Sequence, residues 1–511
     1  MKKLLFTLLW LVGMVPVWAQ QSSDVNSMLA QGKDYYIHCK YDEAFKCFSQ
    51  AADSGNVEAI YNVAVFYLNG YSVDKDEKKA VSMLDSLTRN GYMPAYYHLG
   101  LAYKNGYGGL EKNKTTAQTC YEKAFPAIKE NAEKGDALSQ LRLGNCYFTG
   151  AGVAKDEAKA VQCWQKAAEQ GCAQSQFNLG RCYYNGNGVL PDKAKAVTWW
   201  QKAAEQGDDN AQATLGDCYY SGAGVAKDEA KAVTWYQKAA EQGHAYAQVA
   251  LGECYFNGAG VAKDEAKAVT WYQKAAEQGH AGAQFYLGGC YNGGYGVLPD
   301  KAEAFKWTEK AAEQGHADAQ FNLGCCYYNG DGVWKDCDKA IKWFRKAAEQ
   351  DHAYALNALG SCYFNGNGVT CDYSTAVIYY RKAAEKGIAN AQYNLGLCYQ
   401  TGKGVTQSDT EAVKWYRKAA ENDHEGGMIS LGWMYENGRG VAKNNKQALK
   451  WYRKAADKGD AIAQCNVGLC YYNGWGIAKS KSTAKIWFQK SADQGYERAK
   501  ELLWELYNIE Y

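Results

Sequence analysis

The chain of 511 residues repeats itself with a fixed period, and this feature constrains its fold more than any other. The stretch GAGVAKDEAKAVTWYQKAAEQGHA occurs at 222–245 and again, without a difference, at 258–281. A glycine that follows Leu or Val and precedes a Tyr by three residues recurs every 36 residues from Gly144 to Gly468, and once earlier at Gly100. Self-similarity at such a period predicts stacked structural units rather than separate globular domains.

Each period contains the signals of two helices. Small and apolar residues recur at helical spacing in 317–328 and again in 339–348. The two glycines of NGDGV between these segments predict a turn with positive φ angles. Gly324 lowers helix propensity, so we expect it to permit close approach of the second helix. Because one hairpin cannot bury both of its faces, the pattern predicts an all-α solenoid whose neighbouring hairpins share a core.

The residues of one repeat resemble those of a known family. The segment AQFNLGCCYYNGDGVWKDCDKAIKWFRKAAEQ resembles a unit of the Sel-one-like repeat (SLR) family, which is related to tetratricopeptide repeats. The shared features are the A-Q-x-x-L-G-x-x-Y helix, the G-x-G-V loop and the K-A-x-x-W-Y/F-x-K-A-A helix. The resemblance covers twelve units in 57–494 and implies an α-solenoid that winds as a right-handed superhelix. It also implies that the chain is an adaptor that assembles complexes.

Three regions depart from the regular period. Residues 20–56 have Gly32 in the glycine slot but a short turn instead of the glycine loop, which predicts a hairpin closer to a tetratricopeptide. The step from Gly100 to Gly144 is longer by eight residues, placed within about 107–135, where we expect Pro126 to kink or restart a lengthened second helix. Residues 495–511 predict one more first helix that caps the core, with Trp504 in the glycine slot.

Residues 1–19 have the order of a secretory signal peptide. Lys2 and Lys3 precede an almost wholly apolar run from Leu4 to Val17, and small residues allow cleavage after Ala19. An uncleaved membrane anchor is the alternative, which the short apolar run disfavours. We therefore expect a periplasmic or secreted protein with no membrane span after cleavage.

The chain contains 18 cysteines, and half of them follow the period. Nine occupy the slot two after the repeat glycine: Cys146, Cys182, Cys218, Cys254, Cys290, Cys326, Cys362, Cys398 and Cys470. Equivalent residues of stacked helix pairs lie roughly 10 Å apart, which exceeds the reach of a disulfide. The resemblance adds that secreted relatives pair a Cys late in the second helix with one four before the next glycine, where this chain has residues such as Ala168 and Gln176. We expect small buried hydrophobic residues and no disulfide, with bridges as the alternative.

The histidines follow the same period. His244, His280, His316, His352 and His424 precede the first helix of their units, so copies about one repeat apart cannot share a metal ion. We expect surface junctions, no metal site and no cofactor.

Charge and motifs narrow the function classes. Lys and Arg number 57 against 55 Asp and Glu, a balance that disfavours nucleic acid, which requires a basic surface. No nucleophile or phosphate-loop motif is present, so we expect no enzyme and no catalytic residues. The alternative is a cell-envelope glycan-binding protein or a hydrolase related to peptidoglycan or β-lactams. It would require a cluster of acidic and aromatic residues that breaks the repeat pattern at one place.

The preferred function is the binding of a protein or peptide along the concave side. The sequence does not determine the oligomeric state. In tetratricopeptide-like units, residues three before, one after and four after the glycine point into the groove, and the resemblance transfers these slots to this chain. They contain Phe177, Arg181, Tyr184, Asp217, Tyr220, Glu253, Phe256, Phe285, Phe321, Tyr328, Phe364 and Tyr393. Aromatic residues and Arg are common interface anchors, and we expect Arg181, Tyr184, Tyr220 and Tyr328 to contribute to binding and little to the fold. Alternatively, the aromatic residues pack between neighbouring repeats.

Overall fold

The computed structural model describes residues 24–510, and this part of the chain is all-helical, with α-helices and one short 3₁₀ helix. The predicted signal peptide lies outside the described residues. The chain divides into two compact units, the first ending at Gln278 and the second beginning at Gly279.

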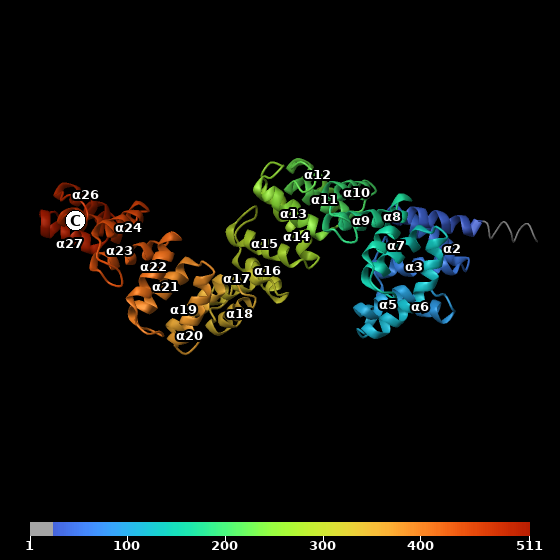
Figure 1. The fold of residues 1–511 in the computed structure, drawn as a ribbon, viewed down its shortest axis with the longest axis horizontal. Coiled ribbons are helices and arrows are strands. Elements are labelled where there is room, and N and C mark those ends of the chain that lie inside the picture. Colours follow the sequence, from blue (N-terminus) through green and yellow to red (C-terminus); the bar gives the residue numbers. More distant parts are fainter. Residues whose placement is uncertain (1–23, 511) are drawn as a thin grey trace, which may run out of the picture. The chain divides into compact units, whose positions relative to one another are not determined.

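In each unit the helices pair along the chain, as the repeats predict (Figure 1). From α3 onward, odd-numbered helices are the first helices of their hairpins and even-numbered helices are the second ones. The first unit contains a helix over 24–37, α2 (Tyr41–Asp53), α3 (Val57–Asn69), α4 (Glu77–Arg89), α5 (Ala95–Asn105), the 3₁₀ helix η1 (Tyr107–Gly109), α6 (Lys114–Glu133), α7 (Ala137–Thr149), α8 (Glu157–Glu169), α9 (Ala173–Asn185), α10 (Lys193–Glu205), α11 (Asp209–Ser221), α12 (Glu229–Glu241), α13 (Ala245–Asn257) and α14 (Glu265–Glu277). The second unit contains α15 (Ala281–Gly293), α16 (Lys301–Glu313), α17 (Ala317–Asn329), α18 (Cys337–Glu349), α19 (Ala353–Asn365), α20 (Tyr373–Glu385), α21 (Ala389–Thr401), α22 (Asp409–Glu421), α23 (Glu425–Asn437), α24 (Asn445–Asp457), α25 (Ala461–Asn473), α26 (Lys481–Asp493) and α27 (Glu497–Tyr507).

The ends of the helices follow from capping residues. Asp228 is the N-cap of the second helix α12, and its carboxylate accepts a hydrogen bond from the backbone N–H of Lys231. Gly222 is the C-cap of the first helix α11 and has φ 77° in the left-handed region. The periodic histidines are also caps: Nδ1 of His352 accepts from the backbone N–H of Ala355 at 3.1 Å. The four other histidines of this column cap α13, α15, α17 and α23 in the same way.

The repeat glycine permits close packing of the two helices of a hairpin, as the sequence predicts. A Cβ atom at Gly324 would lie 2.5 Å from Cδ1 and Cε1 of the buried Phe344 ring. The same contact with a Trp, Tyr or Phe ring recurs in other repeats, for example between Gly252 and Tyr272. A larger residue at Gly324 or Gly252 would therefore overlap the ring of the second helix.

The cysteine column lies in the core. Eight of the nine cysteines two after the repeat glycine are buried, and Cys326 is half-buried. All 18 cysteines fall within the described residues, and none of them forms a disulfide there.

A ladder of carboxamides joins neighbouring hairpins. The side-chain amide of Gln248 donates to the backbone carbonyl of Ala240 at 3.1 Å, and its oxygen accepts from Gln278 at 2.8 Å. The pattern recurs in other repeats, for example at Gln140 and Gln464, whereas α19 and α23 have Leu356 and Met428 at this slot.

The first hairpins fold back onto later repeats of the same unit, which the sequence did not predict. Helix α6 is 20 residues long and contains Pro126 within one helix, where other second helices have 13 residues. Beyond it, Lys33 Nζ lies 3.0 Å from Asp136, and the Arg142 guanidinium lies 4.8 Å from the centre of the Tyr61 ring. Ile37 joins the hydrophobic cluster of α7, α8 and α9, beside which α2 and α3 are seen in Figure 1.

Candidate binding surface

The twelve candidate residues all lie on first helices, from α9 to α21. We call the side chains three before, one after and four after each repeat glycine the first-helix face of their unit. Arg181 and Tyr220 are exposed there, and the other ten candidates are half-buried. None is completely buried, so each has some surface available for a ligand.

Several of the aromatic candidates pack between neighbouring repeats. The rings of Phe285, Phe321 and Tyr393 stack on the capping histidine of the next repeat, with ring centres 4.7–5.0 Å apart. Each of these histidines therefore has two structural roles, which the sequence did not show. The alternative that the aromatic side chains pack between repeats holds for these three residues.

Two of the four predicted anchor residues make contacts within the fold. Tyr184 packs against the Trp200 ring with centres 5.5 Å apart, and the hydroxyl of Tyr328 accepts a hydrogen bond from Asn367 at 2.7 Å. Tyr220 and Arg181 remain exposed.

A pocket of about 550 Å³ lies between the folded-back hairpins and the first helices of the same unit. We call it the hairpin pocket; its lining includes Tyr41, Tyr71, Phe177, Asp208 and Asp209. Asp208 is only 8% exposed, and burial raises the pKa of its carboxyl to about 6. The hairpins thus cover part of the predicted groove at Phe177. The sequence signal was the stretch 208–210, Asp-Asp-Asn, where the next repeat has His-Ala-Tyr.

A second pocket of about 390 Å³ surrounds Arg181. This arginine pocket is formed by α5, α7, α8 and α9, and its lining includes Leu101, Asn145, Trp164 and Asn178. Arg181 is the one charged residue among those that line it. The carboxamides of Asn145 and Asn178 also line this pocket and were not among the residues predicted from the sequence.

A third pocket, of about 370 Å³, brings together Asp217, Tyr220 and Glu253 from the predicted set. In this tyrosine–carboxylate pocket, Tyr236 and Tyr246 donate hydrogen bonds to Asp217 at 2.7 and 2.9 Å. Burial, together with the neighbouring Asp217 carboxylate, raises the pKa of both tyrosines. The pocket therefore has a fixed negative charge and two neutral phenol walls.

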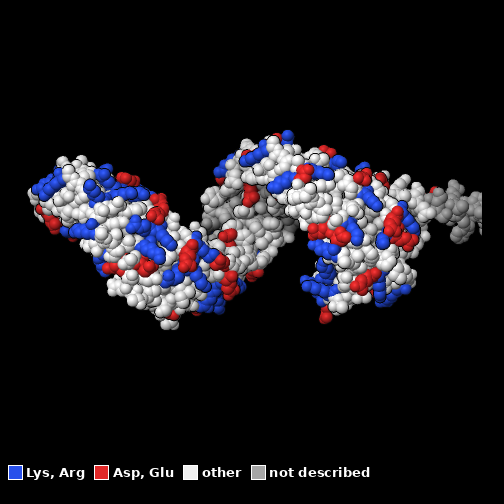
Figure 2. Space-filling model, viewed as in Figure 1, with Lys and Arg blue, Asp and Glu red and all other residues white. Residues whose placement is uncertain are grey.

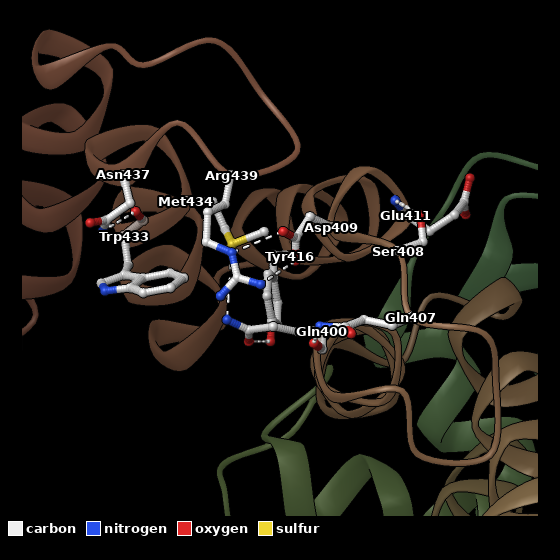
Figure 3. Close-up of polar contacts among 10 residues, drawn as sticks. All are labelled: Gln400, Gln407, Ser408, Asp409, Glu411, Tyr416, Trp433, Met434, Asn437 and Arg439. Atoms are coloured by element: carbon white, nitrogen blue, oxygen red, sulfur yellow. Dashed lines mark hydrogen bonds and ion pairs between the residues drawn. The ribbon is translucent and has the colours of Figure 1, made fainter.

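In the second unit, the slot one after the glycine becomes apolar. It holds Leu397, Trp433 and Leu469 in successive repeats. Trp433 is 38% exposed, and the guanidinium of Arg439 lies 5.4 Å from its ring centre (Figure 3). Arg439 is held by two hydrogen bonds to Asp409, at 2.9 and 3.0 Å.

Within residues 24–510, no group of three or more His, Cys, Asp or Glu side chains could hold a metal ion. No helix in this part of the chain is long and apolar enough to cross a membrane. On the face shown in Figure 2, Lys and Arg are interspersed with Asp and Glu in each unit.

Comparison with known proteins identifies the family. The model of the Sel1 repeat matches 13 segments, from 34–56 and 57–92 to 461–496. The chain is a Sel1-repeat protein. The match includes 34–56, the hairpin that the sequence suggested was closer to a tetratricopeptide.

One solved structure with an SLR fold matches almost the whole chain. The crystal structure of c5321, a protective antigen of uropathogenic Escherichia coli with an SLR fold, is 34% identical and covers 90% of this chain and 97% of its own, with a TM-score of 0.64. A Sel1-repeat protein of Oxalobacter formigenes is 33% identical over 60% of this chain and 90% of its own, with a TM-score of 0.49.

Curated relatives match over shorter segments. HRD3B of Arabidopsis thaliana, a component of an ERAD-associated E3 ubiquitin-protein ligase, is 31% identical over 22% of this Sel1-repeat chain. The DAP3-binding cell death enhancer 1 of Rattus norvegicus is 31% identical over 25% of it. The chain spans less than a third of the length of either relative, 17% and 30% respectively.

Proposed function

We propose that this Sel1-repeat protein is an exported, non-catalytic scaffold that binds a protein or peptide on its first-helix face. The observation that carries the proposal is the difference between two adjacent repeats. Residues 222–245 and 258–281 are identical, whereas the first-helix segments that follow, 246–257 and 282–293, differ at half of their positions. Copies that are fixed in their loop and second helix have therefore diverged on the first helix.

Four of the six positions that differ, Tyr246, Glu253, Phe256 and Asn257, are exposed or half-buried, whereas Val249 and Ala250 are buried. Tyr246, Ala250, Glu253 and Asn257 line the tyrosine–carboxylate pocket and have no counterpart in the next repeat. The residues common to both copies include the buried Leu251, Gly252 and Cys254. Variation on a constant core is what a binding surface requires. The names of HRD3B and of the DAP3-binding cell death enhancer 1 also describe association with other proteins.

The test compares variants on the two kinds of helix. Arg181→Ala combined with Tyr220→Ala removes exposed side chains from the first-helix face, and we expect it to abolish capture of partners from an extract of the native cell envelope. Thr198→Ala with Thr234→Ala is the matched control on exposed sites of α10 and α12. Circular dichroism melting verifies that both variants fold. Equal capture by the two variants would exclude this part of the first-helix face.

Export is the second element of the proposal, and it rests on the order of residues 1–19. The similarity to a protective antigen agrees with a protein that leaves the cytoplasm. We expect the mature chain to begin at Gln20, which N-terminal sequencing of protein from its host can establish. An intact Met1 in the cytoplasmic fraction would contradict export.

Glycan binding is a second candidate function, and the hairpin pocket favours it. Two carboxylates, several carboxamides and the rings of Tyr41, Tyr71 and Phe177 meet there at one place that breaks the repeat pattern. Carboxylates and carboxamides can bind hydroxyl groups while aromatic rings cover an apolar sugar face. Co-sedimentation with purified peptidoglycan is the test, with Asp209→Asn as the variant. Sedimentation equal to that of a non-binding protein would exclude this candidate.

A further inference from the structure

The first-helix face of the first unit has an uneven charge pattern. The slot one after the repeat glycine is charged in three successive repeats, where it holds Arg181, Asp217 and Glu253. In the other repeats from Gly100 to Gly468 this slot is uncharged. A positive side chain is thus followed along α9, α11 and α13 by two negative ones.

Two of these charges are not used by the fold. No hydrogen bond or ion pair joins Arg181 or Glu253 to another residue within 24–510. Asp217 accepts two tyrosine hydroxyls on one carboxylate oxygen, Oδ1, which leaves Oδ2 for a ligand. A charge held beside a pocket without a protein partner is available to a charge of the opposite sign.

The positive and the negative side chains of this slot lie in different pockets. The arginine pocket is lined by carboxamides and aromatic rings and contains no carboxylate. The residues that line the tyrosine–carboxylate pocket include no Lys or Arg. Lys227 lies 5.8 Å from the Tyr220 ring centre and pairs with Glu229. Phenol rings beside a carboxylate suit an ammonium or guanidinium group, which interacts with both.

We propose that the first-helix face of α9–α13 binds an extended protein segment that carries one acidic and one basic side chain. The acidic side chain binds Arg181 in the arginine pocket, and the basic side chain binds Asp217 and Glu253 in the tyrosine–carboxylate pocket. Neighbouring repeats lie roughly 10 Å apart, and an extended chain rises about 3.3 Å per residue. The two side chains are therefore separated by about three to six residues in the ligand. The inference rests on the proposed function, because it names the chemistry of the partner on the same face.

The experiment is selection of a random peptide display library on the immobilised full chain. We expect the selected peptides to be enriched in an acidic and a basic residue at this separation and in one order. Arg181→Gln removes the preference for the acidic residue and lowers the affinity of the selected peptides about tenfold, the size of one lost charge-assisted hydrogen bond. Glu253→Gln removes the preference for the basic residue. Glu241→Gln on α12 is the matched control and changes neither preference.

A charge exchange gives the sharpest test. In the double variant Arg181→Glu with Glu253→Lys, the path of the peptide backbone is unchanged, so the order of the two charges in the selected peptides is reversed. Circular dichroism verifies folding, and the two single variants give an independent answer if the double variant does not fold. Peptides without a charged pair, or an order that the exchange leaves unchanged, would overturn the inference. If capture from the envelope extract still requires Arg181 and Tyr220 in that case, the proposed function stands and only the charge order is wrong.

Discussion

The repeat glycine offers the most direct test of the packing described above. Gly324→Ala adds a Cβ atom that would lie 2.5 Å from two atoms of the Phe344 ring and 3.2 Å from the carbonyl oxygen of Ala340. Ordinary contacts of this kind are about 3.5–4.0 Å, so the two helices of the hairpin must separate or the buried ring must move. Such overpacking costs about 1–3 kcal/mol, and the better helix propensity of Ala returns about 1 kcal/mol. We expect a net destabilisation of up to about 2 kcal/mol.

The chain provides its own control. Gly289 is a helical glycine in α15, exposed to solvent, and a Cβ atom there would meet no atom within 4 Å. Gly289→Ala gains helix propensity without a clash, so it stabilises α15 by up to about 1 kcal/mol.

Native-state hydrogen exchange is the suitable assay, because a repeat array does not unfold in one step and each helix pair reports its own opening free energy. In a Phe344→Leu background, Gly324→Ala should cost less, since the smaller side chain can make room. The reasoning is refuted if Gly324→Ala slows exchange in α17 as Gly289→Ala does in α15, or if the cost is the same in both backgrounds.

Three further predictions concern protons, thiols and one ion pair. Burial lowers the pKa of His98 and of His424, so below about pH 6.5 the unfolded chain binds protons that the folded chain does not. The melting temperature should therefore fall as the pH decreases from about 6.5 toward the folded pKa values. His98→Gln should make this dependence of the melting temperature on pH less steep. Burial raises the pKa of the Cys254 thiol to about 11 and of the Cys470 thiol to about 12. A maleimide should therefore label the exposed Cys371 first and the two buried thiols only after denaturation. Labelling of the buried thiols that requires prior reduction would indicate disulfides. Arg439→Ala should destabilise the hairpin of α23 and α24 by about 1 kcal/mol or less, because the ion pair with Asp409 is partly exposed. Arg439→Lys should recover less than half of the lost stability, since Lys cannot form both hydrogen bonds to Asp409. Equal hydrogen-exchange rates in the wild-type protein and both variants would exclude a structural role for the pair.

The features that could be predicted from the sequence are those that the period encodes. Helix pairing, the close approach at Gly324 and the burial of the cysteine column follow from residues that recur at fixed spacing, because each copy has the same neighbours. The histidine column was recognised, but its role was not. A cap and a stack require the ring to face both its own helix and the aromatic residue of the preceding repeat, and spacing alone does not show direction.

The folding back of the first hairpins could not be predicted for the opposite reason. Lys33 and Asp136 are about a hundred residues apart, and their contact occurs once. No repeated pattern marks a contact that is made only once, and the length of α6 shows that the period is interrupted but not where the chain turns. The hairpin pocket could not be predicted for the same reason, since the residues that line it come from both sides of the interrupted period.

The two units therefore present different chemistry on the same backbone. In the first unit the slot after the glycine carries Arg181, Asp217 and Glu253, whereas in the second it ends in Leu397, Trp433 and Leu469. Contacts with the charged slots weaken as salt increases, and contacts with the apolar slots do not. Because the side chains of Arg181 and Glu253 are not hydrogen-bonded within residues 24–510, exchanging these two residues with Leu397 and Leu469 should move the salt dependence from one unit to the other. Asp217 stays in place, because it accepts a hydrogen bond from the buried Tyr236. The repeated scaffold thus separates what the protein must keep in order to fold from what it can vary in order to bind.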